Sequence, residues 1–519
     1  MSSGRRRSGI VHLVGAGPGD PGLITVRGAA LLRRADVVIC DALVPPDLLR
    51  PVRPGTEVIR VGTRGGARRL GQEAINRAML ARARRGLRVV RLKGGDPSLF
   101  GRGGEEGEAL VRARVPFEVV PGVTAALGAA ATTGIPLTHR RHASAVHFAT
   151  GHVDPEKPAD GVDWKALAGG GTVVLYMSVG NLGGTVGRLL AAGLGPETPA
   201  ALVRWATRPE QRVLCGTLGT IAALARRAAL RPPALLIAGD VVRLRGRLDW
   251  FGKRPLFGRT IVVTRARDQA APFTAMLEES GARVLEAPAI ALRPPRSWAP
   301  LDRALGRLDR YRLVVFTSVN GVVRFFGRLG ERRIDLRTLQ GLEIVAIGPG
   351  TAAALEERGL RVAALPAEFR AEGIVQVLGR RSLEGVGVLI PRAAAARDLL
   401  VRELRRRGAR VDVVPVYRAV PAREGIGEVV RALRAGAIDL VTFASSSTVA
   451  HFVRKFRNAA DGRRLRRVPA AVIGPITAET ARREGFRVAV MPRAYTIPAL
   501  AEAIVRRFRS SPSGTPRGS

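Results

Sequence analysis

Short runs of β-branched residues alternate with Ala/Leu/Arg-rich stretches along almost the whole chain of 519 residues. Strands are predicted at 37–39, 87–92, 172–177, 260–264, 313–318, 343–348, 387–391, 440–445 and 470–474. Alternating strands and helices are typical of α/β folds with mainly parallel sheets. Since the chain is too long for one hydrophobic core, we expect two to four domains of this class.

The chain is predicted to divide into two dissimilar halves at an Arg-, Gly- and Pro-rich stretch. The predicted parts are a basic tail 1–8, a domain 9–245, a linker 246–257, a domain 258–508 and a disordered tail 509–519. Residues 313–359 and 440–485 repeat one pattern: a strand ending in hydroxyl residues, a helix, a strand ending in Ile-Gly-Pro-x-Thr-Ala, and a helix. This repeat predicts two similar α/β lobes in the second half.

The formal net charge is +41, and only five of the 84 basic residues are lysines. Such a charge suits nucleic acid, a polyanionic small substrate, or solvated arginine faces that reflect coding bias. The arginines are spread along the chain and aromatic residues make up 4%, so no stacking platform accompanies them. We therefore expect no nucleic-acid partner and favour small-molecule substrates.

The other polar residues exclude several further classes. Two cysteines without a CxxC motif exclude a disulfide framework and fit a reducing cytoplasm. His139, His142, His147 and His152 are spaced irregularly, so no metal site is predicted. Neither a signal peptide nor a membrane-length apolar run is evident. The expected location is the cytoplasm, without a membrane partner.

Three glycine-rich loops follow predicted strands in the first half. The first, residues 12–22, reads HLVGAGPGDPG. A dinucleotide fingerprint needs glycine at position 20, where the chain has Asp20, and Pro18 and Pro21 lack the N–H donors that pyrophosphate requires. These residues exclude NAD and FAD. In the third loop, Thr124 is expected to cap a helix. The first loop and the loops 91–106 and 119–140 would together line one edge of a parallel sheet.

Together, the blocks at 14–44, 89–106, 119–140 and 150–152 resemble uroporphyrinogen-III C-methyltransferase of the tetrapyrrole methylase superfamily, over roughly residues 9–250. The resemblance implies a two-lobed methylase fold, a homodimer through this half, S-adenosyl-L-methionine as cofactor, and two methyl transfers to uroporphyrinogen III that give precorrin-2. The family's cofactor contacts match Pro18, Gly94, Gly95, Asp96, Leu99, Thr124, Ala125, Met177 and Ala206.

Two further positions of the methylase resemblance concern catalysis. Asp41 matches the family's proposed general base, although a turn aspartate is the alternative. The family's usual lysine is replaced by Thr63, which cannot act as an ammonium acid. The neighbouring Arg64 is expected to bind a substrate carboxylate and not to donate a proton, because the pKa of a guanidinium is too high.

In the second half, the motifs at 316–322, 347–352, 414–419, 443–449 and 473–481 resemble uroporphyrinogen-III synthase, over roughly residues 258–508. The resemblance implies two α/β lobes joined by two crossings and a cleft that closes hydroxymethylbilane with loss of water, without a cofactor. Tyr417 matches the tyrosine suggested to assist departure of the hydroxyl. Candidate carboxylate-binding residues are Ser318, Asn320, Ser445, Ser446, Ser447 and Thr477, with Arg265 and Arg392 at strand ends.

These resemblances predict a bifunctional enzyme in which the second half makes uroporphyrinogen III and the first half methylates it. No glycine fingerprint for a dehydrogenase module is present, so the product would pass to siroheme or cobalamin synthesis through another protein. The alternative is a methylase half that acts on a later corrin intermediate, joined to a synthase-like half that is a regulatory ligand-binding module.

Overall fold

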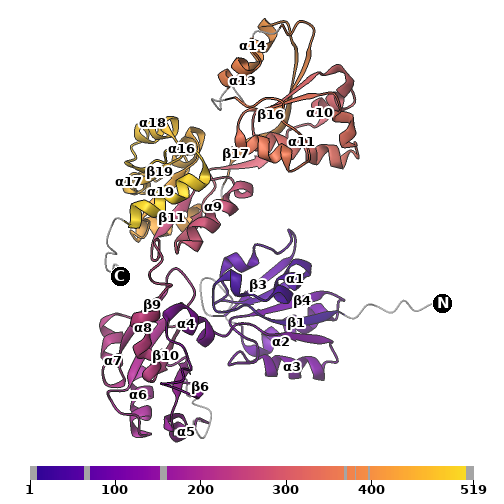
Figure 1. The fold of residues 1–519 in the computed structure, drawn as a ribbon. Helices are drawn as coiled ribbons and strands as arrows, with labels where there is room; N and C mark the ends of the chain where they lie inside the picture. The colour runs from indigo at the N-terminus through magenta and orange to yellow at the C-terminus, as the bar shows by residue number, and fades with distance from the viewer. Residues whose placement is uncertain are drawn as a thin grey trace, which may run out of the picture. The chain divides into compact units, whose positions relative to one another are not determined.

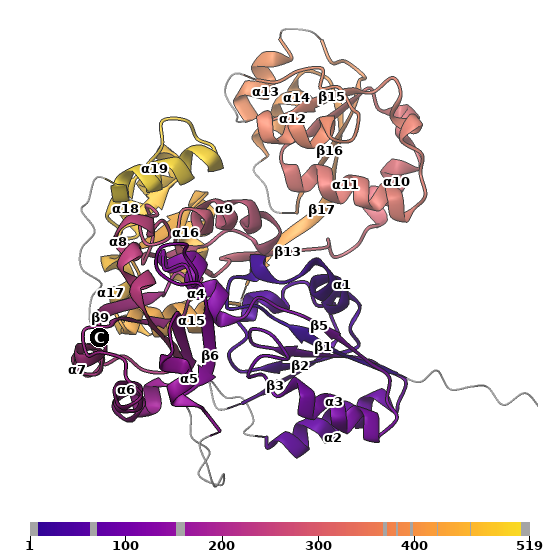
Figure 2. The ribbon, with the colours of Figure 1, turned by 60° about the horizontal axis from the view of Figure 1, so that its bottom comes forward.

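A computed structural model describes residues 9–62, 70–151, 161–366, 371–379, 382–394, 398–422, 424–456 and 458–509. These residues form an α/β protein with four five-stranded sheets (Figures 1 and 2). The chain divides into two compact units, the first mainly residues up to Thr260 and the second mainly Ile261–Ile504. No helix in the described ranges is long and apolar enough to cross a membrane.

The first sheet of the first unit is entirely parallel, with the strand order β3-β2-β4-β1-β5. The strands are β1 (Ile10–Gly15), β2 (Val37–Asp41), β3 (Glu57–Val61), β4 (Arg88–Lys93) and β5 (Phe117–Val120). Helix α1 (Val26–Arg34) packs on one face of the sheet, and α2 (Gln72–Ala83) and α3 (Gly103–Arg112) pack on the other (Figure 1). Because β4, β1 and β5 are parallel neighbours, the loops that follow them leave the same edge.

The second sheet of the first unit departs from the expected parallel arrangement. Its order is β6-β7-β10-β8-β9, and only the β6–β7 pair is parallel. Helix α4 (Ala125–Thr133) covers one face, and α5 (Trp164–Ala168), α6 (Leu182–Ala191) and α7 (Leu218–Arg227) cover the other. The strands are β6 (Val146–Thr150), β7 (Thr172–Tyr176), β8 (Pro199–Arg204), β9 (Arg212–Thr217) and β10 (Ala234–Ala238).

The stretch predicted as a linker, residues 246–257, begins within helix α8 (Arg245–Leu248). Trp250 donates a hydrogen bond from its indole N–H to the carbonyl of Ala131, at 2.7 Å, and Phe251 and Leu256 are buried. The stretch is therefore packed, at least in part, against the end of α4. The domain limits themselves stay a prediction.

The second unit holds two lobes, each with its own sheet. The outer lobe has the order β12-β11-β18-β19-β20, and the inserted lobe has the order β13-β17-β16-β14-β15. The outer strands are β11 (Thr260–Val263), β12 (Arg283–Glu286), β18 (Leu440–Phe443), β19 (Ala470–Val472) and β20 (Val488–Val490). The inserted strands are β13 (Ile290–Arg293), β14 (Leu313–Phe316), β15 (Glu343–Ala346), β16 (Gly387–Ala393) and β17 (Arg410–Pro421).

The repeat predicted in the second half is present in the structure. Ser318 begins the helix after β14 by accepting from the Gly321 N–H at 3.0 Å, and Ser445 begins the helix after β18 by accepting from the Thr448 N–H at 3.3 Å. The helices of this unit are α9 (Arg267–Glu279), α10 (Ala299–Leu305), α11 (Val319–Glu331), α12 (Pro349–Glu356), α13 (Ala371–Val377), α14 (Leu399–Arg406), α15 (Ile426–Arg434), α16 (Ser446–Val453), α17 (Ala459–Arg467), α18 (Pro475–Arg483) and α19 (Ile497–Arg509).

Two chain crossings join the lobes, as the resemblance implied. One runs from β12 to β13 and the other runs from β17 to α15. The Ala289 N–H in the first crossing donates to the Thr264 carbonyl at 2.9 Å, and the Ala422 N–H in the second donates to the Ala289 carbonyl at 3.4 Å. The crossings therefore lie side by side.

We expect Lys455, just after α16, to make the free energy of unfolding depend on pH through its contact with the first crossing. Its Nζ donates a hydrogen bond to the Pro288 carbonyl, and burial lowers the pKa of Lys455 from 10.5 to about 8, against the attraction of Glu424. Between these values the unfolded chain binds a proton that the folded chain lacks, so the free energy of unfolding rises with pH. Calorimetry should show the melting temperature of the wild type rising relative to Lys455→Met between about pH 8 and pH 10. A difference that stays constant across this range contradicts the prediction.

Candidate active sites

The three glycine-rich turns of the first unit meet at one edge of the parallel sheet, as predicted. Gly17 and Gly95 exchange backbone hydrogen bonds at 3.2 and 2.9 Å. The Gly122 N–H donates to Asp96 Oδ2 at 2.9 Å. The turns after β1 and β4 are thereby joined through backbone groups, and the turn after β5 is joined to them through the Asp96 carboxylate.

The glycines permit a backbone approach that no other residue allows. A Cβ atom on Gly122 would lie 2.3 Å from the Gly95 oxygen and 2.7 Å from the Gly15 Cα. A Cβ atom on Gly15 would lie 2.5 Å from the Gly122 backbone. The obstructing atoms belong to the backbone and cannot rotate away, so glycine is required at both positions.

The proline-containing first turn also links the two sheets of the first unit. Pro18 packs against Gly128 of α4, where an added Cβ would lie 2.6 Å from the proline Cγ. Asp20 Oδ1 accepts from the Gly22 N–H at 2.7 Å and caps a short 3-10 turn, Pro21–Leu23. The Asp20 N–H donates to Thr207 Oγ1 at 3.0 Å. The residues that excluded a dinucleotide thus fix the turn in place.

Asp96 holds the second and third turns together. Its Oδ1 accepts from the N–H groups of Ser98 and Leu99 at 2.7 and 3.1 Å, in addition to the Oδ2 contact with Gly122. A carboxylate has about four lone-pair sites, so one remains for a ligand. Asp96 is chiefly a turn-positioning residue in this structure, and its predicted contact with a cofactor stays a prediction.

The expectation that the Thr124 side chain caps α4 is wrong. Thr124 stands at the N-cap position, but its hydroxyl pairs with the Tyr176 hydroxyl at 2.6 Å. The phenol oxygen of Tyr176 instead accepts from the Ala126 N–H at 3.2 Å. Tyr176 therefore takes over the capping role, and it was missed because a tyrosine ending a strand carries no capping signal in the sequence.

Met177 lies on strained backbone, and Ala206 lies between two strained residues. Met177, directly after β7, has φ 55°, and Trp205 and Thr207, after β8, have φ 53° and 69°. Left-handed backbone is uncommon outside glycine and concentrates at ligand sites. The Met177 side chain is 53% exposed, so it is not a core filler. Ala206, between the two strained residues, is buried.

Asp41 ends β2 beside a buried group of charges. Its Oδ1 lies 2.6 Å from Arg91 Nη2, and its Oδ2 accepts from the Gly94 N–H at 3.1 Å. Arg91 Nε contacts Glu106 Oε1 at 3.0 Å, and Lys93 Nζ contacts Glu106 Oε2 at 2.9 Å. Sequence reasoning missed this charge quartet, although charged residues within a central strand were a signal that could have revealed it.

Some of the residues singled out in the sequence lie outside the residues that the structure describes. Arg64, with Thr63, lies outside the described residues, and so does His152. Within the described part of the chain, no group of three or more His, Cys, Asp or Glu side chains could hold a metal ion.

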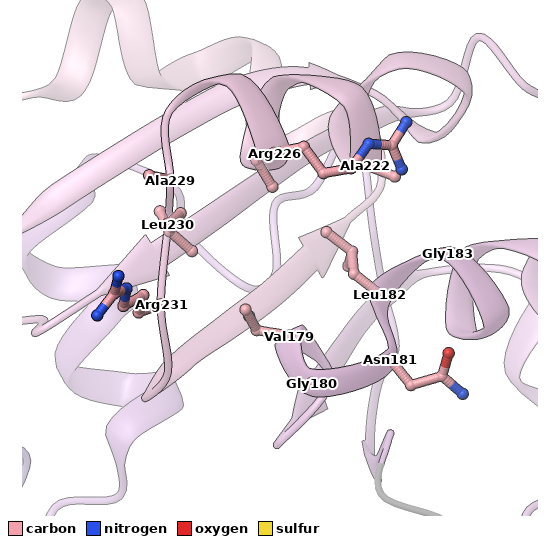
Figure 3. A pocket seen from close by; sticks show the side chains of 11 residues that line it. Val179, Gly180, Asn181, Leu182, Gly183, Ala222, Arg226, Ala229, Leu230 and Arg231 are labelled. Atoms are coloured by element: carbon pink, nitrogen blue, oxygen red, sulfur yellow. The ribbon is translucent and has the colours of Figure 1, made fainter.

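A hollow of about 400 Å³ lies between the 3-10 turn Val179–Asn181, the start of α6 and the end of α7 (Figure 3). Leu182 and Leu230 line it, and Arg226 and Arg231 extend to either side (Figure 3). It contains none of the predicted site residues.

In the second unit, one group of candidates comes together across the two lobes. Ser318 Oγ lies 3.2 Å from the Tyr417 hydroxyl. Gln269 of α9 donates from Nε2 to Asn320 Oδ1 at 3.1 Å, and Arg265 Nη2 donates to Gln269 Oε1 at 3.3 Å. Gln269, which sequence reasoning missed, therefore connects Arg265 of the outer lobe with Asn320 of the inserted lobe.

All the remaining candidates except Arg392 lie at the equivalent strand ends of the outer lobe. Ser445 Oγ lies 3.1 Å from Ser447 Oγ, and Ser446 donates to the Ile476 carbonyl at 3.3 Å. Thr477 is buried in the first turn of α18. Arg392 pairs instead with Asp398 at 2.5 Å in the inserted lobe.

A glycine-turn edge in one unit and repeated strand-end serines in the other define a chain of two α/β enzyme units. Residues 11–222 match the family of tetrapyrrole (corrin/porphyrin) methylases, and residues 271–502 match the family of uroporphyrinogen-III synthase HemD. The "Porphyrin biosynthesis protein HemD" of Ruminiclostridium josui is 37% identical over 96% of this chain and 98% of its own length.

Two further similarities are to methyltransferases. The uroporphyrinogen-III C-methyltransferase of Bacillus subtilis is 36% identical over 69% of this chain and 74% of its own length. The uroporphyrin-III C-methyltransferase of Thermus thermophilus, solved with S-adenosylhomocysteine, is 40% identical, with a TM-score of 0.39 over 45% of this chain and 93% of its own. The chain belongs to the porphyrin-biosynthesis family that joins a tetrapyrrole methylase to a uroporphyrinogen-III synthase.

Proposed function

We propose that the second unit closes hydroxymethylbilane to uroporphyrinogen III and that the first unit methylates this product twice, which gives precorrin-2. Membership of both families, together with a nearly complete match to a porphyrin-biosynthesis relative, carries the proposal. The product of one reaction is the substrate of the other, so a single chain that holds both activities is chemically consistent.

The residues at the glycine-turn edge fit S-adenosyl-L-methionine as the cofactor of the first unit. The proposed contacts, Pro18, Gly94, Gly95, Asp96, Leu99, Thr124, Ala125, Met177 and Ala206, include one carboxylate and no basic side chain. This donor set suits a sulfonium cation and not a phosphate. The cofactor would supply the methyl group, while the turns and the exposed Met177 orient it.

Asp41 is proposed to take up the proton that the macrocycle loses after methylation from a ring nitrogen or a bridging carbon, because the methylated carbon already carries a side chain and has no hydrogen to release. Its carboxylate ends β2 and is partly exposed, at 31% of its side chain. The contacts to Arg91 and the Gly94 N–H hold both oxygens in place. Arg64 is proposed to bind a substrate carboxylate, and the first unit is proposed to form a homodimer, which analytical ultracentrifugation can test.

In the second unit, Tyr417 is proposed to assist departure of the hydroxyl from hydroxymethylbilane. Its hydroxyl pairs with Ser318 at the start of α11, where helix N–H groups favour anions. The strand-end candidates of both lobes, Ser318, Asn320, Ser445, Ser446, Ser447, Thr477, Arg265 and Arg392, are proposed to bind the substrate carboxylates.

Tyr417→Phe is expected to slow cyclisation about fivefold, because one hydrogen bond contributes about 1 kcal/mol. Formation of the type III isomer from hydroxymethylbilane measures this rate. Ser318→Ala in a double-mutant cycle should share the loss, since it removes the same pair. A loss above about a thousandfold would contradict the prediction and make the tyrosine indispensable.

One incubation tests the proposed function. The full chain receives hydroxymethylbilane with or without S-adenosylmethionine. We expect the type III isomer without the cofactor and precorrin-2 with it. Formation of the spontaneous type I isomer alone would overturn the cyclisation. Methylation of a later corrin, without methylation of uroporphyrinogen III, would favour the alternative substrate instead.

A further inference from the structure

The charge quartet of Asp41, Arg91, Glu106 and Lys93 lies beside the glycine-turn edge of the first unit, since Asp41 ends β2 and Lys93 ends β4. Lys93 is 2% exposed, Glu106 0% and Arg91 3%. Successive residues carry opposite charges, from Lys93 through Glu106 and Arg91 to Asp41, and each neighbouring pair forms an ion pair. Asp41 is its only partly exposed member, so the buried charges lead to the carboxylate proposed as the base.

A buried quartet of this kind needs an explanation other than stability. Replacing buried ion pairs with apolar residues of similar volume is often neutral or stabilising. Here α2 adds a further contact, because Gln72 Nε2 donates to Glu106 Oε1 at 3.0 Å. Glu106 of α3 is therefore held from α2 and from β4, which leaves Arg91 little freedom to turn away from Asp41.

We propose that Lys93 and Glu106 are positioning residues for methyl transfer, which act through Arg91 to orient the Asp41 carboxylate and to balance the charge around it. This inference rests on the proposed function of the first unit. With Lys93 and Glu106 present, the quartet carries no net charge. Removing either residue leaves a single uncompensated charge beside Asp41.

The other groups near Asp41 are not altered by substitutions at Lys93 or Glu106. Cys40, its neighbour in β2, is neutral, because burial raises the pKa of its thiol. Arg60 of β3 is a further positive charge near the same strand end, where its guanidinium donates to the Val44 carbonyl at 3.4 Å, and it is the same in every variant compared. Burial lowers the pKa of Lys93, and Arg91 lowers it further, against the attraction of Glu106 and Asp41. Glu106 is thus its principal stabilising partner.

Two single substitutions are expected to move the pH–rate profile in opposite directions. Lys93→Met removes a positive charge, so the base holds its proton more tightly and the acid limb moves to higher pH. Glu106→Gln removes a negative charge and moves the limb to lower pH. Each shift should be at least about half a pH unit, given charges at such separations in a protein interior.

The assay supplies uroporphyrinogen III directly and follows transfer of a radiolabelled methyl group from S-adenosylmethionine. In each single variant kcat should fall about tenfold or more, because the base is no longer held in place. Calorimetric affinity for S-adenosylhomocysteine should stay within about twofold, since neither residue is among the proposed cofactor contacts. Glu108→Gln, on the exposed side of α3, is the matched control and should leave the profile unchanged.

The double variant Lys93→Met/Glu106→Gln removes both charges, and its acid limb should coincide with that of the wild type. If a single variant fails to fold, the double variant still provides a measurement of the acid limb. Shifts in the same direction, an unmoved limb in a folded single variant, or a displaced limb in the double variant would overturn the positioning role. A wild-type chain that transfers no methyl group would instead overturn the proposed function.

Discussion

Gly122→Ala is expected to abolish methyl transfer in the first unit while leaving cyclisation in the second unit intact. The added Cβ would enter the backbone of Gly95 and Gly15, so the three turns would have to separate. Overpacking against backbone should lower the free energy of unfolding by about 3 kcal/mol. Radiolabelled methyl transfer and the melting transition measure the two effects.

Gly104→Ala is the matched control for this substitution. Gly104 lies in the first turn of α3, and a Cβ there meets no atom within 4 Å. Alanine in a helix should be neutral or slightly stabilising. Methyl transfer retained in Gly122→Ala, or lost equally in both variants, would contradict the role assigned to the packed turns.

Asp41→Asn is expected to lower kcat for methyl transfer about 10² to 10⁴-fold, because the amide cannot accept the proton. The amide oxygen can still accept from the Gly94 N–H, so the turn should keep its shape. Affinity for S-adenosylhomocysteine should therefore change little. Initial rates and calorimetry separate these two quantities.

Asp47→Asn is the control for the loss of a carboxylate, because Asp47 lies in the turn Pro46–Leu49 that follows β2. Asp47 pairs with Arg50 and is 47% exposed. We expect wild-type rates in this variant. An Asp41→Asn enzyme that keeps most of its kcat would show that another group or water takes up the proton.

Much of the architecture could be predicted because it depends on local patterns. A strand that runs into Gly-Pro-Asp predicted a turn at a sheet edge, and the parallel order of β4, β1 and β5 brings three such turns together. The repeated pattern around Ser318 and Ser445 predicted the two lobes, since each serine caps a helix after a buried strand. Both features need only short-range information.

The features that sequence reasoning missed depend on which distant segments become neighbours. The strands β8, β9 and β10 read as ordinary buried or half-buried strands, and nothing in their residues shows that they pair antiparallel. Tyr176 caps α4 from 50 residues away in the sequence. Lys93 and Glu106 resemble surface charges until the fold buries them against Arg91.

The outer lobe of the second unit is assembled from both ends of that unit. Strand β11 pairs with β18, so Ile261 lies beside Leu440, while the inserted lobe is contiguous from Ile290 to Pro421. A ribosome that releases the chain from its N-terminus delivers the whole inserted lobe before β18 exists. The inserted lobe can therefore complete its sheet early, whereas β11 of the outer lobe has no β18 to pair with until the chain from Leu440 onward emerges. Because β11 and β18 are far apart in the sequence, we expect closure of the outer lobe to be the slow step of folding in this unit.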